Sequence, residues 1–300
     1  MLKSVRIILA IPAYLDYEIW QMDVKTAFLH KNLIEDVYMI HPEGFVNPTS
    51  ASKVCKLKRS VYGLRQASRS WNIHFDEVVT GLGFIKREED ACLYKKLSGI
   101  SIVFLILYVD DILLIGNDVS MLNSVKESLN GKFSMKDLGE GVYVLGIKIY
   151  RDRSRRLLGL SQSTYIDKVF KRFNMSEAKK EFLPLSHGIR LSETQSPSTS
   201  DERSRMSRIL YASAIGSIMY AMICTKPDVA FVISLTSRYQ ANPGESHWAA
   251  VKTILKYLKR TKEMFLVYGG EEELVIRGYA DASFQTDRDD CRSQSGSWTS

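Results

Sequence analysis

An α+β fold, with an antiparallel sheet backed by helices, is what the 300-residue sequence predicts. The first observation is a pair of short apolar runs, residues 102–109 and 112–115, which are rich in β-branched and aromatic residues and meet at Asp110 and Asp111. Two buried strands joined by a tight turn explain this pattern best. The second observation is the helical spacing of apolar residues in 64–80, which predicts an amphipathic helix. Its apolar face carries Leu64, Ala67, Trp71, Phe75 and Val78.

The other elements follow from the same two periodicities. Residues 2–15 predict a helix that leads into an extended segment, and 17–28 begins with the polar–apolar alternation of a strand. Helices are further predicted at 119–131, 164–175, 208–223, 228–240 and 245–261, and strands at 142–150, 157–160 and 274–280. Residues 183–207 contain two prolines, a glycine and scattered charges, with six serines between Ser192 and Ser207. This composition predicts an irregular, exposed linker.

Composition and charge leave several classes of function open. Hydrophobic residues make up 45% of the chain, enough for one large domain or two smaller ones. Lys and Arg outnumber Asp and Glu by 41 to 34, and the net charge of +7 suits a polyanionic partner, although many ordinary surfaces are as basic. The four cysteines have neither metal-ligand nor disulfide spacing, which favours an intracellular protein over a secreted one. No run reaches the ~18 uninterrupted apolar residues of a membrane span, so we expect no membrane contact.

The adjacent carboxylates Asp110 and Asp111 are the first candidates for chemistry. If both were buried without compensation, each would carry a desolvation cost of several kcal/mol, which a bound divalent cation would offset. A turn tip that points into water explains the pair equally well. Asp23 lies 87 residues before Asp110 (110 − 23) in another segment with strand character. A site built from both segments would supply the shared oxygen ligands that two metal ions roughly 3.5–4 Å apart require, but the sequence alone does not establish that the two strands are neighbours.

At these residues the chain resembles the reverse transcriptase region of a copia-type retrotransposon polyprotein. Residues 21–30, QMDVKTAFLH, look like its motif A, residues 56–71, KLKRSVYGLRQASRSW, like its motif B, and residues 108–111, YVDD, like its motif C. The further matches are residues 134–149 with motif D and the primer grip, 211–231 with the segment before the ribonuclease H domain, and 278–296 with the start of that domain. The motifs occur in the family's order along essentially the whole chain, which makes the resemblance specific.

The resemblance implies an RNA-directed DNA polymerase that transfers nucleotides to a primer 3′-OH with two Mg²⁺ ions, with Mn²⁺ as an alternative metal. Asp23, Asp110 and Asp111 would be its catalytic carboxylates and metal ligands. Phe28 would be the steric gate against the nucleotide 2′-OH, although the residue pattern alone favours a core aromatic. The other residues expected near nucleotide, template or primer are Arg65, Gln66, Tyr108, Val109 and Lys136. Lys136 would be the protonated group near the pyrophosphate, for which a solvated lysine is an equal alternative.

The resemblance also implies partners and a division of the chain. The partners would be an RNA or DNA template-primer and deoxynucleoside triphosphates, with the oligomeric state left open. A polymerase palm with part of the fingers would occupy 1–182, a flexible linker 183–207, a helical thumb or connection segment 208–270, and a truncated ribonuclease H-like start 271–300, where Asp281 matches that domain's first carboxylate. The family's basic fingers strand would precede the first residue, so we expect weak primer extension and no ribonuclease H activity from this chain. The alternative function is a catalytically silent remnant that at most binds nucleic acid.

Overall fold

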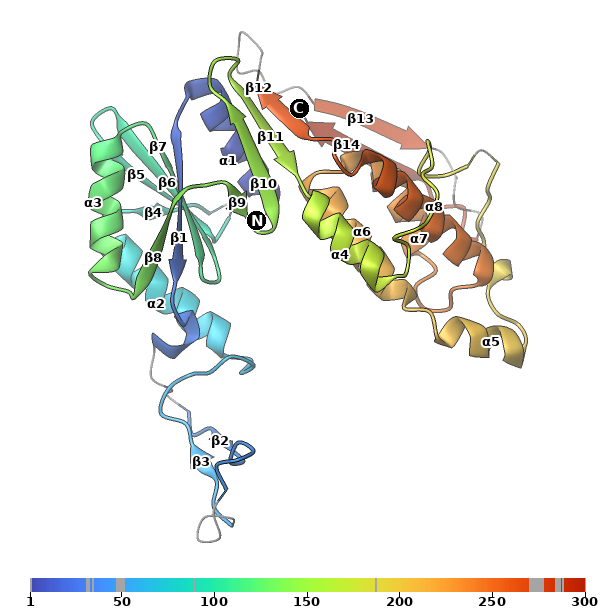
Figure 1. Ribbon diagram of the computed structural model, residues 1–300, viewed down its shortest axis with the longest axis horizontal. Helices are drawn as coiled ribbons and strands as arrows, with labels where there is room; N and C mark the ends of the chain where they lie inside the picture. The colour runs from blue at the N-terminus through green and yellow to red at the C-terminus, as the bar shows by residue number, and fades with distance from the viewer. Residues whose placement is uncertain are drawn as a thin grey trace. The chain divides into compact units, whose positions relative to one another are not determined.

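The computed structural model describes residues 2–30, 33, 35–46, 52–88, 90–186, 188–269, 278–283, 287 and 289–299. The chain forms two compact units, one of Asp16–Val144 and the other of Leu2–Leu15 together with Leu145–Ser300 (Figure 1). Each unit has a hydrophobic core of its own. The combination of helices with antiparallel sheets confirms the α+β class that the sequence predicts.

A six-stranded antiparallel sheet organises the first unit, with the strand order β4-β5-β6-β7-β1-β8. Its strands are β1 (Glu18–Val24), β4 (Ile85–Lys86), β5 (Leu93–Ser98), β6 (Ser101–Tyr108), β7 (Asp111–Gly116) and β8 (Met135–Glu140). Its helices are α2 (Ala67–Gly81) and α3 (Val119–Asn130), with the short 3-10 helix η1 (Ala27–His30) after β1. Strands β6 and β7 form the predicted hairpin, because Tyr108 pairs with Asp111 across a two-residue turn.

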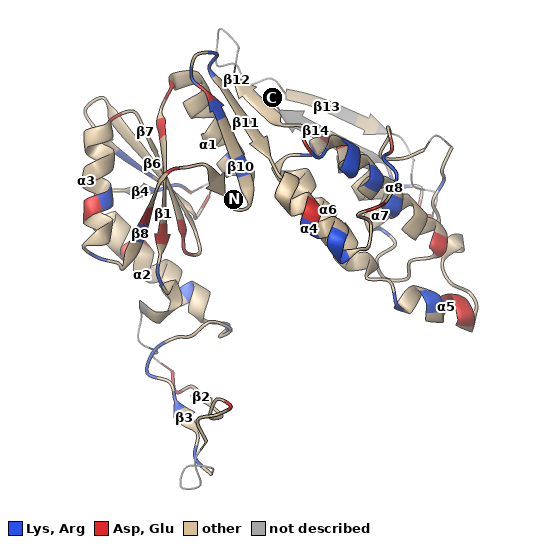
Figure 2. Ribbon diagram, in the orientation of Figure 1, with Lys and Arg blue, Asp and Glu red and all other residues tan. Residues whose placement is uncertain are grey.

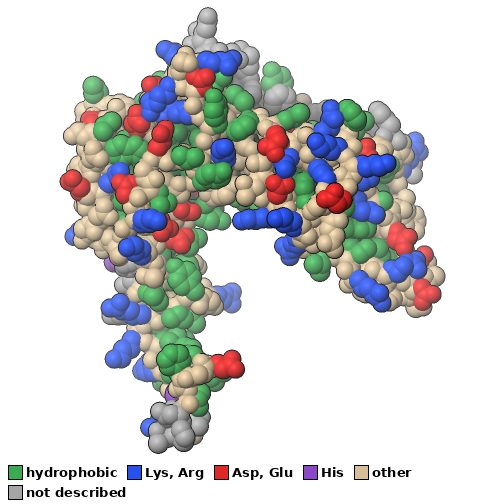
Figure 3. Space-filling model, in the orientation of Figure 1, with side chains coloured by type: hydrophobic (Ala, Val, Ile, Leu, Met, Phe, Trp, Pro, Cys, Tyr) green, Lys and Arg blue, Asp and Glu red, His purple; other side chains and the backbone are tan. Residues whose placement is uncertain are grey.

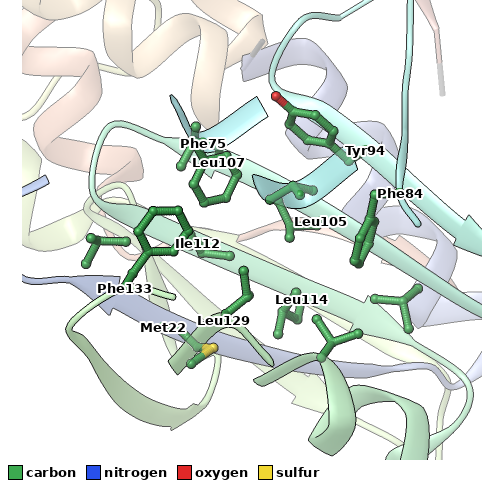
Figure 4. Packing of buried hydrophobic residues seen from close by; sticks show 14 of the residues in the cluster. Met22, Phe75, Phe84, Tyr94, Leu105, Leu107, Ile112, Leu114, Leu129 and Phe133 are labelled. Atoms are coloured by element: carbon green, nitrogen blue, oxygen red, sulfur yellow. The ribbon is translucent and has the colours of Figure 1, made fainter. Parts of the chain in front are cut away.

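Helices α2 and α3 pack against one face of this sheet and share an apolar core with it (Figure 4). Phe75 of α2 is fully buried and stacks on Phe133, with 5.6 Å between the ring centroids. Met22 of β1 belongs to the same cluster. Burying a side chain of this size contributes about 1.5–3 kcal/mol. The buried face of α2 carries the predicted Ala67, Trp71 and Phe75. It differs from the prediction at its ends, because Leu64 precedes the helix and because Val79, not Val78, is the fully buried valine.

A two-stranded ribbon between β1 and α2 leaves apolar side chains exposed to solvent. It pairs β2 (Tyr38–Met39) with β3 (Cys55–Lys56). Figure 3 shows hydrophobic side chains gathered around this ribbon, where Ile40 is 82% and Phe45 is 79% exposed. Because so little of its apolar surface is buried, the ribbon contributes little to the first core.

The second unit combines a sheet with a cluster of helices. Strand β11 (Leu157–Ser161) lies between β10 (Ile147–Asp152) and β12 (Leu266–Gly269), and helix α1 (Leu2–Leu15) contacts β11 and β12. The second core is built by α4 (Ser163–Arg172), α6 (Tyr211–Cys224), α7 (Ala230–Ser237) and α8 (Glu245–Thr261). The remaining elements are η2 (Glu193–Gln195), α5 (Ser200–Ser207), η3 (Pro227–Val229), β13 (Gly278–Ser283) and β14 (Gln294–Thr299). Among the described residues no single helix has the length and apolarity needed to cross a membrane, and only the pair α5 and α6, bent by 45°, meets both requirements together.

The linker predicted at 183–207 differs from the expectation of irregular chain, because its last part is helical. Helix α5 begins after Thr199, whose hydroxyl accepts the Glu202 N–H at 3.2 Å. The Glu202 carboxylate accepts the Thr199 N–H in return at 3.0 Å. This reciprocal capping box supplies partners for two backbone donors that the start of a helix otherwise leaves unsatisfied.

Two predicted strands also differ from the structure. The strand expected at 142–150 is divided into β9 (Tyr143–Val144) and β10, because Leu145 and Gly146 have positive φ angles of 54° and 72°. Such angles lie outside the β region and end a strand. Of the strand expected at 274–280, residues 274–277 lie outside the described part of the chain. The described remainder belongs to β13, which extends to Ser283 and pairs with β14.

Candidate active site

The three predicted carboxylates come together at one end of the first unit's sheet. Asp23 and Asp111 are directly opposite each other in the register of β1 and β7, and the Val24 N–H donates to the Asp110 carbonyl at 2.8 Å. Because side chains alternate between the faces of a strand, Asp23 lies on the face opposite the buried Met22. Figure 2 shows acidic residues at this end of β1 and at the turn between β6 and β7. The structure therefore makes neighbours of the two segments that the sequence left unconnected.

Asp111 is half-buried among like charges. Burial raises the pKa of its carboxyl, and the charges of Asp110 and Asp23 raise the pKa further. The Gln21 side-chain amide opposes this rise, because it donates to Asp111 Oδ1 at 3.1 Å and so stabilises the ionised form. A divalent cation beside the three carboxylates would relieve their mutual repulsion and favour the ionised form in the same way.

The turn that carries Asp110 has a strained backbone. Val109 has a φ of 58°, which is rare for a β-branched residue. Trp71 of α2 donates its indole N–H to the Val109 carbonyl at 2.5 Å and so fixes the turn. Trp71 is itself buried against Phe75 and Phe133. The first core thus holds the turn in its strained conformation, and strain of this kind occurs preferentially at functional sites.

A β-bulge decides which residue of β8 lies beside Asp23. The register between β1 and β8 skips Leu138, so Asp23 is directly opposite Lys136. A continuous register would have placed Asp137 there instead. Asp137 pairs with Lys126 of α3 at 2.5 Å. In the middle strand of this arrangement, Asp23 therefore has a carboxylate, Asp111, on one side and a lysine on the other.

Phe28, the predicted steric gate, lies in η1 just after β1. Its side chain is partly buried against the first core. Its ring meets the Tyr62 ring with 4.7 Å between centroids and an interplanar angle of 51°. Tyr62 falls within the motif B stretch, residues 56–71, and no role was predicted for it. Its position within that stretch is the only signal that could have drawn attention to it, since a loop aromatic has no periodic pattern.

The other predicted residues lie at the start of α2, at the end of β6 and in the second unit. Arg65 is exposed in the turn before α2, and Gln66 is the N-cap residue of α2, where within the described residues its side chain makes no cap hydrogen bond. Tyr108 is the half-buried last residue of β6 and pairs with Asp111. Asp281 belongs to β13 of the second unit, and its side chain lies outside the described part of the chain. The roles of these residues stay predictions.

The carboxylate site suits a divalent metal by its chemistry. Among the residues that the structure describes, no three Asp, Glu, His or Cys side chains already form a complete metal-binding group. Mg²⁺ nevertheless prefers oxygen ligands and normally completes its coordination with substrate phosphates and water around one or two protein carboxylates. Burial is the main cause of the raised pKa of Asp111, and the charges of Asp110 and Asp23 add to it; a nearby cation would oppose both effects. The donor set of Asp23, Asp110 and Asp111 therefore fits Mg²⁺.

Comparison with known proteins shows the family of the chain and some of its relatives. A family model described as reverse transcriptase (RNA-dependent DNA polymerase) matches residues 1–187, and the chain belongs to this family. The predicted resemblance to copia-type retrotransposon polyproteins is confirmed by its relatives. A retrovirus-related Pol polyprotein from transposon TNT 1-94 of Nicotiana tabacum is 44% identical over 98% of this chain and 22% of the relative. The corresponding protein from transposon RE1 of Arabidopsis thaliana is 34% identical over 98% of this chain and 19% of the relative.

A shorter relative covers the same region. A transposon Ty5-1 protein of Saccharomyces cerevisiae is 32% identical over 87% of this chain and 83% of its own length. The chain spans roughly a fifth of the length of the two plant Pol polyproteins, in contrast to this yeast relative. The activity and partners of a whole Pol polyprotein are therefore proposals for this chain.

Proposed function

We propose that the first unit catalyses RNA-directed DNA synthesis, with Asp23, Asp110 and Asp111 as catalytic carboxylates and metal ligands. The observation that carries this proposal is the direct opposition of Asp23 and Asp111 on neighbouring strands, with Asp110 in the adjoining turn. Membership of the reverse transcriptase family supports a template-primer and deoxynucleoside triphosphates as the partners of the site. The template would be RNA or DNA.

Nucleotidyl transfer at this site would depend mainly on positioning and charge. Two bound Mg²⁺ ions, or Mn²⁺ in their place, would stabilise the attacking primer oxygen and the leaving phosphate oxygen. The residues of the chain hold the ligands in place: Gln21 orients the Asp111 carboxylate, and Trp71 fixes the turn that carries Asp110. Lys136, opposite Asp23, would provide a protonated group near the pyrophosphate. Preorganised positioning and electrostatic stabilisation of this kind supply most of the rate enhancement in phosphoryl transfer.

The positions of four further residues and Phe28 suit contacts with the nucleotide, the template and the primer. Phe28 in η1, just after β1, would crowd the nucleotide 2′-OH. Arg65 and Gln66, at the start of α2, would lie near the incoming nucleotide and the template. Tyr108 and Val109 would pack beside the primer end, since they lead directly into the turn that carries Asp110.

The wider architecture is part of the same proposal. Residues 1–182 would form the palm with part of the fingers, 183–207 a linker, 208–270 the thumb or connection segment, and 271–300 a ribonuclease H-like start with Asp281. The helix α8 supports the thumb assignment, because Figure 2 shows basic residues along it that suit the phosphates of a nucleic acid. These functional boundaries are distinct from the compact units, which divide after Val144.

The test compares Asp110→Asn with a matched control, Asp36→Asn, in the whole chain. Asp36 is an exposed aspartate of the same unit, in a surface ion pair with Lys56, and such pairs contribute only about 0–1 kcal/mol. Calorimetry measures Mn²⁺ binding, and a primed RNA template measures extension. We expect Asp110→Asn to weaken Mn²⁺ binding and to abolish any extension, and Asp36→Asn to change neither.

The outcomes separate the two candidate functions. Equal Mn²⁺ binding by Asp110→Asn and the unmodified chain would show that the carboxylate site is misassigned. A chain that binds the primed template, yet neither binds Mn²⁺ through Asp110 nor extends the primer, would be the catalytically silent, nucleic-acid-binding alternative. Asp110-dependent binding together with Asp110-dependent extension would establish the polymerase.

A further inference from the structure

Tyr62 has no part in the proposed catalysis, yet its ring contacts Phe28 of η1. Its ring lies 4.7 Å from the Phe28 ring, measured between centroids, with an interplanar angle of 51°. Tyr62 stands in the loop before α2, 34 residues after Phe28 (62 − 28). One side chain of the motif B loop therefore holds the segment that follows β1.

A role in the core does not explain this contact. Tyr62 is 53% exposed, whereas Phe28 packs against the first core. A ring pair that serves only stability would be buried on both sides, because burial is what makes an aromatic ring stabilising. Tyr62 instead covers Phe28 from the solvent side, and so restricts the positions that the Phe28 ring can take.

The Tyr62 phenol also lies within the field of the carboxylates. Burial raises its pKa, and the charges of Asp110 and Asp23 raise the pKa further. The phenol therefore stays a neutral hydrogen-bond donor at physiological pH. Under the proposed function, a ring that contacts Phe28 and is reached by the charges of Asp110 and Asp23 borders the place where the nucleotide sugar would lie.

We propose that Tyr62 determines sugar specificity together with Phe28: its ring holds the Phe28 ring against the 2′ position of the bound nucleotide, and the rigid pair excludes a 2′-OH. This inference rests on the proposed function, because it requires a nucleotide to bind beside Asp23 and Asp110. Tyr62 acts through Phe28 and is therefore a positioning residue. Loss of the Tyr62 ring would free the Phe28 ring to move and admit ribose, whereas loss of the hydroxyl alone leaves the ring contact intact.

Equilibrium binding of dATP and ATP tests the inference without requiring turnover. The whole chain is titrated with each nucleotide in the presence of Mg²⁺ and a primed template that ends in a dideoxynucleotide and presents thymine. The variants are Phe28→Ala, Tyr62→Ala, Tyr62→Phe and Tyr62→Leu, which fills space without a planar ring. Tyr38→Ala is the matched control, since Tyr38 is 55% exposed and belongs to β2 of the same unit.

The measured quantity is the ratio of the ATP and dATP dissociation constants. We expect Phe28→Ala, Tyr62→Ala and Tyr62→Leu each to lower this ratio about 10-fold, mostly through tighter ATP binding, which is the scale of discrimination that one shape contact supplies. Tyr62→Phe and Tyr38→Ala should keep the ratio of the unmodified chain. The double variant Phe28→Ala with Tyr62→Ala should lower the ratio no further than the single variant with the larger effect, because both residues form one wall of the sugar site.

Each other outcome overturns a defined part of the argument. A ratio lowered by Phe28→Ala and unchanged by both Tyr62→Ala and Tyr62→Leu would overturn the role of Tyr62 and leave the polymerase proposal intact. Equal weakening of both nucleotides in the Tyr62 variants would reduce Tyr62 to general support of the pocket. If Phe28→Ala also left the ratio unchanged, the steric gate itself would be misassigned. If the unmodified chain bound neither nucleotide in an Asp110-dependent way, the proposed function would fail and the inference with it.

Discussion

His247 makes the stability of the second unit depend on pH, and the direction follows from its contacts. His247 is fully buried at the start of α8. Its Nδ1 accepts the Gly244 N–H at 2.9 Å, its Nε2 faces the Ser192 carbonyl at 3.1 Å, and its ring stacks on Tyr239 at 3.9 Å between centroids. This pattern requires a neutral imidazole with its proton on Nε2. A second proton on Nδ1 would face the Gly244 N–H donor and remove that contact at the helix start.

The magnitude of the effect has an upper limit from proton linkage. Burial lowers the pKa of His247, while the Ser192 carbonyl and the charge of Asp289 act in the opposite direction. The unfolded chain therefore binds more protons than the folded chain once the pH falls below about 6.5, the ordinary histidine value. One proton changes the free energy of unfolding by at most about 1.4 kcal/mol per pH unit, hence by at most about 2 kcal/mol between pH 6.5 and pH 5. For a unit of this size a loss at that limit would lower the melting temperature by about 4–8 °C.

Thermal unfolding at pH 7.5 and pH 5 measures the effect, with His247→Gln as the test variant. A glutamine three residues after the N-cap accepts the N-cap N–H in the ordinary capping box, so this variant keeps the contact and loses the titration. Carboxylates elsewhere also titrate, so the quantity of interest is the difference between the variant and the unmodified chain. His74→Gln is the control, because His74 lies in α2 of the first unit and is partly exposed. Parallel loss of stability in His247→Gln and the unmodified chain would refute the role of His247.

Three further predictions concern the first unit. Phe75→Ala should destabilise it by about 3–5 kcal/mol in urea unfolding, and the control Phe45→Ala, at a residue 79% exposed, should change little; a loss below about 1 kcal/mol for Phe75→Ala would contradict the described core. Gln21→Leu removes the hydrogen bond to Asp111 and should weaken Mn²⁺ binding about 10–100-fold in calorimetry, as losses of ligand-orienting groups do; unchanged affinity would show that Asp111 needs no such orientation. Asp23→Cys combined with Lys136→Cys should form a disulfide on mild oxidation, because the two residues are directly opposite, whereas Asp23→Cys with Asp137→Cys should not; the reverse result would mean that the bulge is absent in solution.

The elements that the sequence predicted best are those that are determined by their local residue pattern rather than by a partner elsewhere in the chain. The apolar runs 102–109 and 112–115 contain the hairpin almost completely, since both strands are buried and only two residues separate them. Strand β8 could not be predicted in this way, because MKDLGE has almost no apolar alternation and its pairing with β1 depends on the partner strand. Helix α5 could have been predicted, since Thr199 and Glu202 have the spacing of a capping box. The serine-rich composition of the segment favoured a linker instead.

The candidate site shows the same division between local and tertiary information. The resemblance of the motifs singled out Asp23, Asp110 and Asp111, and the structure brings their segments together as strand neighbours. The position of Lys136 opposite Asp23 depends on a register shift that no local pattern announces. Tyr62 was missed for a similar reason, because its relation to Phe28 exists only after the loop before α2 folds against η1.

The bulge at Leu138 has a consequence for how the gene can change. In an unbroken strand, gain or loss of a single codon moves every later pair by one residue and turns each side chain to the other face. At the bulge the chain already holds one unpaired residue. Loss of the Leu138 codon would only make the strand regular, and Asp23 would still face Lys136. The bulge therefore lets β8 lose one residue without changing which side chain lies opposite Asp23.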